Sequence, residues 1–597
     1  MEEGWAKAWA EGSATGDPCG VSRSALGRAD NALMPKPTAP LATTPNSANP
    51  GMPVMTATLP ASAGAAVRSG EMPHLRLAQT DAQAAPVAAS SSARGGGALR
   101  LAGVHVYFIG IGGSGMSGLA RVFAARGARV SGSDQAPSTA TASLQQAGIS
   151  VDFEQAGGLI PGDVGLVVAS AAIKPDHPQW AQATRRGVSV MLYAEALGRV
   201  MQGATGVAIA GTHGKSTTTA MLGSALVDAG LDPGVIVGAT SRQLQKGNLG
   251  ASEGDDAVGF RVGSSEIPTG TLAGRPGVLV AEACEYNRSF HNYRPTIASI
   301  SSVEADHLDV YGTLDAVVES FRQFALLLPP ASEGGRLLIA HDNAHRREVT
   351  AGLSCEVQTI GFSPEADWVV AYDPRTREVR LSHERREVAI WRNSVPGAHN
   401  AFNASVALVL ASWLGAQVPR VASSLASFKG VDRRLQLLGE RVVSGTDHAS
   451  GGTGQGVVRV FDDYGHHPTE VDVTLRALRE AERPEERGGR LICVFQPHQH
   501  SRTKHLMEEF AASFSQADVV IVPHIYFVRD SEEDRHLVTA GDLVDRLREK
   551  GVRAMHLYPF AAIIEQLGTL CRGGDVVVVM GAGDVWKIGT GYLTAPV

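Results

Sequence analysis

Short runs of apolar residues alternate with helix-compatible segments from residue 104 onward. The run VHVYFIG at 104–110 predicts a buried strand, the glycines of GIGGSG predict a tight turn, and SGLARVFAARG at 117–127 has the apolar spacing of a helix. The strand-like segment ARVSGSD follows directly. Further apolar runs at 165–170 and 188–193 complete a small parallel sheet that we expect to end near residue 203.

A second unit of the same kind starts at GVAIAGTHGKSTTTAMLGSALVDAG, residues 206–230, and continues through the apolar runs 277–285 and 296–307. The stretch 241–276 is polar and rich in glycine, so the pattern predicts a long loop there. Alternating segments predict a small antiparallel appendage with strands at 368–373, 377–382 and 387–391.

The phrase FKGVDRRLQLLGE marks a boundary near residue 428, and a third α/β unit follows it. Its glycine-rich segment 444–456 is predicted to be a surface loop. Residues 1–98 are rich in Ala, Pro, Ser and Thr and lack periodicity, which predicts a disordered extension. The sequence therefore predicts an α/β protein whose three domains span 99–203, 204–428 and 429–597.

Composition narrows the possible functions. The chain has 597 residues and a formal net charge of −7, and its basic residues are not clustered, which argues against nucleic-acid binding. The five cysteines are far apart and form no CxxC pair, so a reducing, cytoplasmic location is expected. The N-terminus is acidic and no apolar run reaches 18 residues, which argues against a secretion signal and a membrane span. The oligomeric state stays open.

The strongest local motif lies between a predicted strand and a predicted helix. Glycines there allow backbone amides and the helix N-terminus to face phosphate oxygens, Lys215 adds a positive charge, and Ser216 adds a hydroxyl for magnesium. Its first glycine lies only three residues before the second, which departs from the common GxxxxGK[ST] form. The predicted ATP-binding residues of this motif are Gly211, Thr212, His213, Gly214, Lys215, Ser216 and Thr217.

Acidic groups and a histidine follow two later strands of the same unit. Glu282 and Glu285 follow one strand, and Glu304, Asp306 and His307 follow the next. The carboxyl ends of parallel strands meet at one edge, where the phosphate motif also lies. Divalent cations prefer oxygen ligands, and Mg²⁺ or Mn²⁺ sites tolerate an imidazole. Helix capping is the alternative role for these groups, but their place beside a phosphate motif favours a metal site.

A second glycine motif stands at the front of the chain. Gly110, Gly112 and Gly115 form GxGxxG after a strand, and Asp134 ends the next strand about 20 residues later. This pattern alone would favour an NAD-dependent enzyme. Because the chain also carries an ATP-type motif, we expect the front motif to hold a nucleotide diphosphate substrate instead.

The chain resembles the Mur ligase family over roughly residues 103–590. The motifs that carry the resemblance are FIGIGGSGMSGLA, SGSD, GTHGKSTTT, AEACEYNRSF, VEADHLDVYG, PGAHNAFNASVA, GVDRRLQ, DDYGHHPTE, FQPHQHSRT and GAGDVW. The resemblance implies a Rossmann-like N-terminal domain, a central P-loop ATPase-type domain and a Rossmann-like C-terminal domain. It also implies an ATP-dependent ligase of peptidoglycan precursor synthesis that joins L-alanine to the carboxylate of UDP-N-acetylmuramate through an acyl phosphate, releasing ADP and phosphate.

The resemblance implies further roles for individual residues. Lys215, Glu285 and His307 are the expected catalytic residues, and Glu285 is expected either to orient the metal shell or to accept the alanine ammonium's proton. Gln499 departs from the family, since many relatives have arginine there. The metal, Mg²⁺ with Mn²⁺ as the alternative, is assigned to Ser216, Glu282 and His307. Further ATP contacts are assigned to Asn400, Asn403, Arg434 and Asp463, the last two through closure of the third domain. The UDP-sugar is assigned to Gly110, Gly112, Gly113, Ser114, Gly115, Met116, Ser133, Asp134, His498 and Arg502.

Three alternatives remain open at this point. A recycling ligase that joins a murein tripeptide to the same UDP-sugar would use the same phosphate and metal groups. An NAD(P)-dependent oxidoreductase is favoured only by the front glycine motif. A non-catalytic UDP-sugar-binding regulator would keep the fold without the activity, and the presence of Lys215, Glu282 and His307 argues against it.

Overall fold

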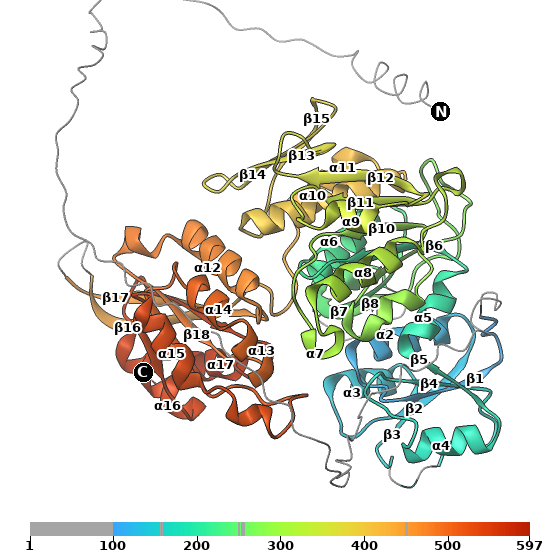
Figure 1. Cartoon of the computed structure of the whole chain (residues 1–597), viewed down its shortest axis with the longest axis horizontal. Helices are drawn as coiled ribbons and strands as arrows, with labels where there is room; N and C mark the ends of the chain where they lie inside the picture. Colours follow the sequence, from blue (N-terminus) through green and yellow to red (C-terminus); the bar gives the residue numbers. More distant parts are fainter. Residues whose placement is uncertain are drawn as a thin grey trace, which may run out of the picture. The chain divides into compact units, whose positions relative to one another are not determined.

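The computed structural model describes residues 99–596 except 156, 158, 249–250, 252–256 and 448–451. All of these residues belong to one compact unit of the chain. The unit contains three sheets, each flanked by helices, which confirms the predicted three-domain α/β fold (Figure 1). The predicted disordered extension, 1–98, lies outside the described residues.

The N-terminal domain is built on a five-stranded parallel sheet with the order β3-β2-β1-β4-β5. Its central strand, β1, is completely buried, as its apolar sequence predicts. The short strand β3 was not predicted from the sequence. The elements are β1 His105–Ile109, α2 Ser114–Ala125, β2 Arg129–Ser133, α3 Thr139–Gln146, β3 Ser150–Asp152, β4 Leu166–Ala169, α4 Pro178–Arg185, β5 Ser189–Leu192 and α5 Tyr193–Met201.

The middle domain contains a ten-stranded sheet with the order β15-β14-β13-β12-β11-β10-β6-β9-β7-β8. Strands β6, β9 and β10 are parallel neighbours, so their carboxyl ends share one edge. The strands are β6 Thr205–Ala210, β7 Gly234–Ser241, β8 Val258–Arg261, β9 Val278–Glu282, β10 Ile297–Ile300, β11 Arg336–Ala340, β12 Glu356–Gly361, β13 Trp368–Asp373, β14 Glu378–His383 and β15 Arg386–Arg392. The helices are α6 Lys215–Asp228, η1 Arg242–Gln245, η2 Tyr286–Asn292, α7 Leu308–Tyr311, α8 Leu314–Ala325, η3 Ala331–Glu333, α9 Arg346–Thr350, α10 Ala398–Trp413 and α11 Val418–Ala426.

The predicted long loop at 241–276 is wrong in part, because strand β8 lies within it. β8 is fully buried and pairs antiparallel with β7. Its Phe260 packs against helix α2 of the N-terminal domain, where a Cβ atom added at Gly118 would lie 2.8 Å from the Phe260 Cβ. The Arg121 guanidinium also lies 4.9 Å from the centre of the Phe260 ring. Packing against another domain therefore buries a strand that its polar surroundings hide in the sequence.

The three alternating strands of the middle domain were predicted correctly, but they do not form the separate appendage that was predicted with them. β13 pairs in parallel with β12, so the antiparallel strands β13, β14 and β15 extend the main sheet. Trp368 and Trp391 from this extension are buried in the core of the middle domain. The extension is thus a packed part of the domain.

The C-terminal domain has a six-stranded sheet with the order β16-β17-β21-β18-β19-β20. Its core strands β18 and β21 are completely buried. The strands are β16 Gln436–Asp447, β17 Gly452–Asp463, β18 Leu491–Phe495, β19 Val519–Val522, β20 Ala554–His556 and β21 Val576–Met580. The helices are α12 Pro468–Glu482, η4 Pro484–Arg487, α13 His500–His505, α14 Met507–Ser513, η5 Asp534–His536, α15 Ala540–Glu549, α16 Phe560–Leu570 and α17 Trp586–Thr594.

The predicted surface loop at 444–456 is also wrong for most of its length. β16 and β17 form a long antiparallel hairpin, and their pairing continues through Ser444 with Gln455 to Asp447 with Gly452. Backbone hydrogen bonds hold such a ladder whatever the side chains are. Glycine is required at Gly456, where an added Cβ would collide with the backbone of Gly573. A glycine-rich composition therefore concealed two strands.

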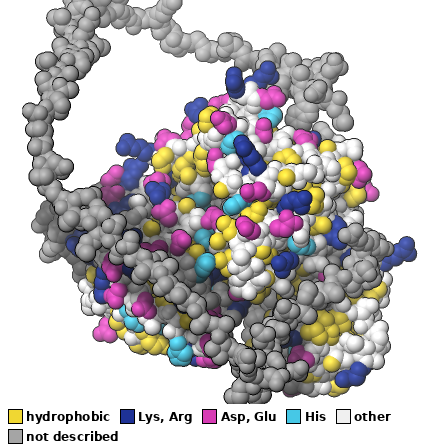
Figure 2. Space-filling model, in the orientation of Figure 1, with side chains coloured by type: hydrophobic (Ala, Val, Ile, Leu, Met, Phe, Trp, Pro, Cys, Tyr) yellow, Lys and Arg dark blue, Asp and Glu magenta, His cyan; other side chains and the backbone are white. Residues whose placement is uncertain are grey.

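The structure shows how surface charges are distributed and which cysteines are free. On the face shown in Figure 2, Lys and Arg side chains are interspersed with Asp and Glu side chains. In the part of the chain that the structure describes, no helix is long and apolar enough to cross a membrane. Cys284, Cys355, Cys493 and Cys571 are free thiols.

Candidate active site

The phosphate loop, Gly211–Thr217, joins the buried strand β6 to helix α6. Gly211 and Gly214 have φ angles of 129° and 82°, a region that side chains disfavour. A Cβ at Gly211 would collide with Ser301, and one at Gly214 would lie 2.5 Å from Oδ1 of Asn403. No side chain caps the N-terminus of α6 at Gly214. The first-turn amides of this helix can therefore bind an anion.

Lys215 is held under the phosphate loop by the loop's own carbonyl groups. Its Nζ donates hydrogen bonds to the carbonyl oxygens of Gly211 at 2.6 Å and Thr212 at 2.9 Å, and to Oε1 of Glu285 at 3.1 Å. Burial lowers the pKa of Lys215, but the neighbouring Glu285 carboxylate more than offsets this and raises that pKa above its ordinary value. Lys215 is therefore a protonated cation positioned beside the phosphate loop.

Two groups of side chains near the phosphate loop can hold divalent cations. In the first, Ser216 Oγ donates a hydrogen bond to Oε1 of Glu282 at 2.8 Å, and the other oxygen of Glu282 accepts from the Gly238 amide at 2.6 Å. In the second, Glu285, Asp306 and His307 place one ligand atom each within 4.8 Å of one another. Of the predicted metal residues, Ser216 and Glu282 thus lie in the first group, and His307 lies in the second with Glu285 and Asp306.

His307 reaches the second group through an unusual backbone conformation. Its φ of 54° is left-handed, and it is the N-cap residue of the short helix α7. The Asp306 carboxylate accepts a hydrogen bond from the His307 amide at 2.7 Å. Burial lowers the pKa of His307, which favours the neutral imidazole that a metal ion requires.

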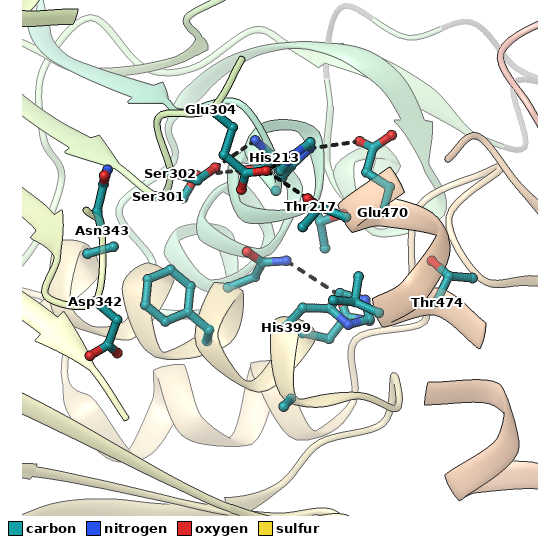
Figure 3. Close-up of a pocket in the computed structure, with 18 of the residues that line it drawn as sticks. His213, Thr217, Ser301, Ser302, Glu304, Asp342, Asn343, His399, Glu470 and Thr474 are labelled. Carbon is teal, nitrogen blue, oxygen red and sulfur yellow. Dashed lines mark hydrogen bonds and ion pairs between the residues drawn. The ribbon is translucent and has the colours of Figure 1, made fainter. Parts of the chain in front are cut away.

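A cavity of about 590 Å³ lies beside the phosphate loop (Figure 3). This volume is within the range of small-molecule and cofactor sites. His213 and Glu304 face it from the middle domain, and Glu470 reaches it from helix α12 of the C-terminal domain. The predicted ATP-binding residues that line it are His213, Gly214, Thr217, Asn400, Asn403, Arg434 and Asp463. We call this space the nucleotide cavity.

The C-terminal domain contributes Arg434 and Asp463 to the wall of the nucleotide cavity. Asp463 accepts hydrogen bonds from the amides of Leu435 at 2.8 Å and Gly465 at 2.7 Å. Burial raises the pKa of Asp463 to about 6. The Arg434 guanidinium lies 5.0 Å from the centre of the Tyr464 ring. Both residues thus line the nucleotide cavity, and their contact with ATP stays a prediction.

His213 bridges the middle and C-terminal domains. Its Nε2 lies 3.4 Å from Oε2 of Glu304, and its Nδ1 lies 3.3 Å from Oε1 of Glu470. Burial lowers the pKa of His213, but the carboxylates of Glu304 and Glu470 reverse this and raise it to about 9. Thr469 strengthens the same contact, since its Oγ1 donates to Oε2 of Glu304 at 2.7 Å.

The front glycine motif is organised by its own acidic residue. The Gly112 amide donates a hydrogen bond to Oδ2 of Asp134 at 2.7 Å. In dinucleotide-binding proteins this acidic residue instead binds the ribose hydroxyl groups. Gly115 allows the close approach of Tyr193, whose Oη would lie 2.7 Å from an added Cβ. Gly113 and Ser114 are exposed, whereas Met116 is buried in the domain core.

Ser133 differs from its predicted role as a contact of the UDP-sugar. It is completely buried, and its hydroxyl group donates to Gln179 at 2.7 Å and accepts from Gln155 at 3.1 Å. These bonds anchor the end of strand β2. The pleat of the strand explains this orientation, since a strand-end side chain points either into the crevice or into the core.

His498 and Arg502 lie beside the second metal group. Arg502 donates from Nη2 to Oδ1 of Asp306 at 2.7 Å, and its Nη1 lies 3.2 Å from Nδ1 of His498. Burial raises the pKa of Asp306, but the Arg502 charge more than offsets this and holds that pKa well below its usual range. Gln499 is buried, with a φ of 70°, and its amide donates to the Tyr526 carbonyl at 3.1 Å. The structure therefore groups His498 and Arg502 with the residues around His307.

Comparison with known proteins identifies the family. The chain matches the Mur ligase family catalytic domain over residues 105–205, the Mur ligase middle domain over 209–411 and the Mur ligase glutamate ligase domain over 451–583. The UDP-N-acetylmuramate–L-alanine ligase of Agathobacter rectalis is 36% identical over 495 residues, which cover 82% of this chain and 98% of that protein. The chain belongs to the Mur ligase family.

Other Mur ligases support the same assignment. The UDP-N-acetylmuramate–L-alanine ligase of Mycobacterium avium is 36% identical over 511 residues, covering 82% of this chain and 95% of that protein. Two crystal structures share the fold at lower identity. The UDP-N-acetylmuramate-alanine ligase of Thermotoga maritima has a TM-score of 0.61 at 21% identity, covering 82% of this chain and 98% of its own. A murein peptide ligase of Psychrobacter arcticus has a TM-score of 0.56 at 24% identity, with the same coverage of each chain.

Several site residues of this Mur ligase were not predicted from the sequence. Glu470 and Thr469 are the main examples, and both follow the histidines of DDYGHHPTE. His467 is the N-cap residue of α12, and Glu470 completes a capping box. The cap places Glu470 toward the phosphate loop, which only the packing of two domains reveals. Asp342, Asn343 and His399 also line the nucleotide cavity.

Proposed function

We propose that this chain is an ATP-dependent ligase that joins L-alanine to the carboxylate of UDP-N-acetylmuramate and releases ADP and phosphate. The observation that carries the proposal is the convergence of Lys215, the Ser216–Glu282 pair and the Glu285–Asp306–His307 group on the phosphate loop. The identity of the substrates is supported by relatives that are named for this activity and that the chain matches over nearly their whole length. The reaction belongs to peptidoglycan precursor synthesis and takes place in the cytoplasm.

The chain supplies charge and positioning for two chemical steps. In the first, a carboxylate oxygen of the sugar attacks the γ-phosphorus of ATP, the bond to the β-phosphate oxygen breaks, and ADP leaves. In the second, the alanine amine attacks the acyl carbon of the acyl phosphate, phosphate leaves with the bond electrons, and the amine's proton passes to solvent. Lys215 neutralises the transferring phosphoryl group. Glu285 keeps Lys215 protonated and in place, which makes it a positioning residue.

The residues beside the phosphate loop suit magnesium. Ser216 and Glu282 offer a hydroxyl and a carboxylate, and the second group offers the Glu285 and Asp306 carboxylates with the His307 imidazole. Oxygen-rich sites of this kind favour Mg²⁺ or Mn²⁺. When bound, such an ion neutralises phosphate charge.

The amino-acid carboxylate needs a free cation near the second metal group. Gln499 carries no charge, and Arg502 is already paired with Asp306. Arg529 lies with its guanidinium 4.5 Å from the centre of the Tyr286 ring, and that ring lies 5.1 Å from the His307 ring. Among the described residues no carboxylate forms an ion pair with Arg529. We therefore assign the alanine carboxylate to Arg529.

The oxidoreductase alternative is disfavoured by the geometry of the front motif. Asp134 is engaged by the Gly112 and Gln135 amides, whereas a nicotinamide dinucleotide would need its carboxylate for the ribose. The tripeptide-recycling alternative shares every phosphate-binding residue with the alanine ligase. Only the choice of acceptor separates the two.

The deciding experiment is ADP release by the purified full chain with UDP-N-acetylmuramate and a panel of acceptors. We expect release to require the sugar nucleotide and Mg²⁺, and to be fastest with L-alanine. Faster release with L-alanyl-γ-D-glutamyl-meso-diaminopimelate would replace the proposal with the recycling reaction. If no acceptor stimulates ADP release, the chain is not this ligase.

A further inference from the structure

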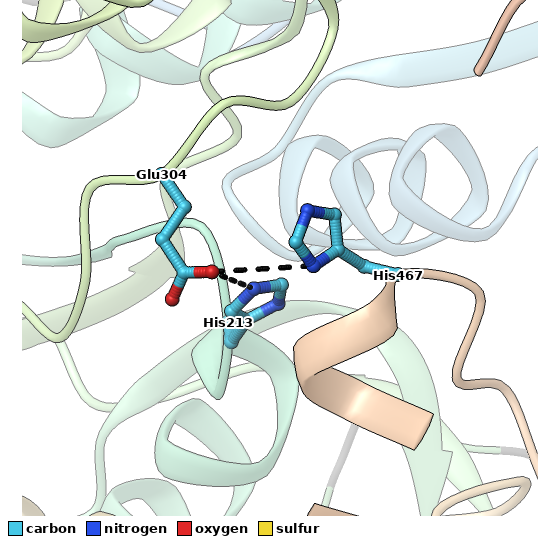
Figure 4. Close-up of side chains that lie close together, drawn as sticks. All are labelled: His213, Glu304 and His467. Carbon is cyan, nitrogen blue, oxygen red and sulfur yellow. Dashed lines mark ion pairs between the residues drawn. The ribbon is translucent and has the colours of Figure 1, made fainter. Parts of the chain in front are cut away.

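Three ligand-type side chains meet where the phosphate loop contacts helix α12. His213 and Glu304 come from the middle domain, and His467 comes from the N-cap of α12 in the C-terminal domain (Figure 4). Each offers one ligand atom, and these atoms all lie within 4.8 Å of one another. We call these three residues the interdomain triad. It is separate from Ser216, Glu282 and the Glu285–Asp306–His307 group, to which the reaction's metal is assigned.

The distances within the interdomain triad suit a small ion with tetrahedral geometry. Oε2 of Glu304 lies 3.4 Å from Nε2 of His213 and 4.0 Å from Nδ1 of His467. Ligands about 2.0–2.1 Å from a tetrahedral Zn²⁺ are separated by roughly 3.3 Å. The 3.4 Å separation already matches this value, and the 4.0 Å separation would match it after the His467 ring moves about 0.7 Å closer to Glu304. His467 Nδ1 now accepts only a 3.3 Å hydrogen bond from the Thr469 amide, which an ion would displace.

The surroundings of His213 resemble those of a metal-bound histidine. Its Nε2 is buried and has no hydrogen-bond partner among the described residues, and it faces Glu304. Its Nδ1 lies 3.3 Å from the Glu470 carboxylate. Histidines that bind metal usually hold the second ring nitrogen against a carboxylate in this way. His467 is 6% exposed, so its ring is also fixed.

Charge and access favour a dication at this place. Glu304 and Glu470 contribute two carboxylates, and Arg434 lies 3.7 Å from Glu470 as the compensating cation. An ion would replace the proton that His213 shares with the two carboxylates. His213 and Glu304 line the nucleotide cavity, so the fourth ligand position is open to water or to a phosphate oxygen. Two imidazoles and one carboxylate favour Zn²⁺ over Mg²⁺.

We propose that His213, Glu304 and His467 form a binding site for Zn²⁺ or a similar transition-metal ion that ties the C-terminal domain to the phosphate loop. The ion holds His213 and α12 together, and it therefore slows ATP entry and ADP release. The site is distinct from the magnesium positions of the proposed ligase reaction. Binding can accordingly be measured without turnover.

The test is a Zn²⁺ titration of the full chain against a chromophoric chelator, without nucleotide and with excess Mg²⁺ to fill the oxygen-rich sites. We expect one tight equivalent, and at least a tenfold weaker affinity for it in both His467→Ala and Glu304→Gln. His345→Ala is the matched control, since His345 also pairs with a carboxylate, Glu348, at 2.8 Å, but far from the triad in sequence. It should bind Zn²⁺ like the parent. Thermal unfolding of each variant shows that it is folded.

Three results would overturn the proposal. One is the absence of a tight equivalent in the parent chain. Another is unchanged binding in His467→Ala with loss in His307→Ala, which would assign the ion to the Glu285–Asp306–His307 group. The third is a sulfur ligand in the X-ray absorption spectrum of the zinc-loaded chain, since the triad supplies only nitrogen and oxygen. Unchanged Zn²⁺ binding in a chain that lacks ligase activity would refute the proposed function alone.

Discussion

Lys215 and Glu285 form an ion pair under the phosphate loop, with Nζ 2.9 Å from Oε2 and the two side chains only 13% and 3% exposed. Lys215 is the first residue of α6, whereas Glu285 follows β9, so adjacent parallel strands bring them together. The pair keeps the lysine charged in a buried place. A phosphate group that binds the loop meets a cation that is already positioned.

The first prediction concerns the charge of Lys215. Lys215→Ala should lower kcat/KM for ADP release by about 10²–10³-fold, because a preorganised cation at the transferring phosphoryl group is lost. Steady-state kinetics of ADP release measure this change in kcat/KM. The matched control is Lys246→Ala, which removes an exposed lysine paired with Asp228 at 2.6 Å and should leave the rate within about twofold. Full ADP release by Lys215→Ala would remove Lys215 from the mechanism.

The second prediction compares the two ends of helix α6. Gly214 precedes the helix with a φ of 82°, and Gly230 follows it with a φ of 84°. Alanine at either position should cost roughly 1–2 kcal/mol of stability, because both glycines are left-handed. Only Gly214→Ala brings a Cβ against Asn403 in the nucleotide cavity; at Gly230 the nearest atom, Thr269 Oγ1, is 3.6 Å away. Calorimetric titration with ATP should thus show weaker binding for Gly214→Ala alone. Equal ATP affinities in the two variants would contradict the assigned loop geometry.

The third prediction concerns pH and the His213 bridge. His213 has a pKa raised from 6.5 to about 9 in the folded chain, so its stabilisation is complete below pH 6.5 and is lost as the pH rises through about 9. Burial raises the pKa of Glu304, but His213 outweighs burial and lowers that pKa from 4.5 to about 2. The stabilisation that Glu304 contributes is therefore complete above pH 4.5 and is lost as the pH falls through about 2.

The pH dependence can be measured by thermal unfolding of the parent and of His213→Gln. The difference in Tm between them should be largest near pH 5–6.5 and should shrink by pH 10. His345→Gln, which alters an ion pair with an exposed glutamate, is the control and should show a small difference at every pH. A His213→Gln difference that stays constant from pH 6 to pH 10 would show that the bridge does not depend on the imidazolium.

The sequence predicted those parts of the site that are local in the chain. The phosphate loop was found because a strand, two glycines, a lysine and a helix stand in order, and the structure shows that Gly211 and Gly214 need their positive φ. Glu282 and His307 were found because the ends of parallel strands share an edge. These inferences need only the geometry of one βα unit.

The parts that were missed depend on contacts between distant segments. His213 and Glu470 are 257 residues apart, and no pattern near either one indicates the other. β8 was read as loop because its polar flanks conceal a strand that α2 buries. The β16–β17 hairpin was hidden by glycines that its backbone pairing tolerates. Ser133 was assigned to the ligand from its motif, whereas its two glutamine partners hold it in the core.

The fourth prediction concerns Arg529 and the choice of acceptor. Gln499 stands where many relatives have arginine, and Arg502 is held by Asp306, so the alanine carboxylate needs another cation. Arg529 is exposed above Tyr286, next to the ring of His307. Arg529→Ala should raise the KM for L-alanine by about 10-fold, the equivalent of losing roughly 1.4 kcal/mol from a charge-assisted contact, and should leave the KM for ATP unchanged.

Arg535→Ala is the matched control for this fourth prediction. Its guanidinium also lies over an aromatic ring, that of Phe527, at 4.1 Å, but it is paired with Glu532 at 3.1 Å. We expect its KM for L-alanine to equal that of the parent. Gln499→Arg in the Arg529→Ala background should restore part of the affinity, because Gln499 and His307 line the same pocket and the change returns one positive charge to it. If Arg529→Ala has the parent's KM for L-alanine, Arg529 is not the anchor. Arg502 would then be the anchor, and it would have to give up its ion pair with Asp306 when alanine binds.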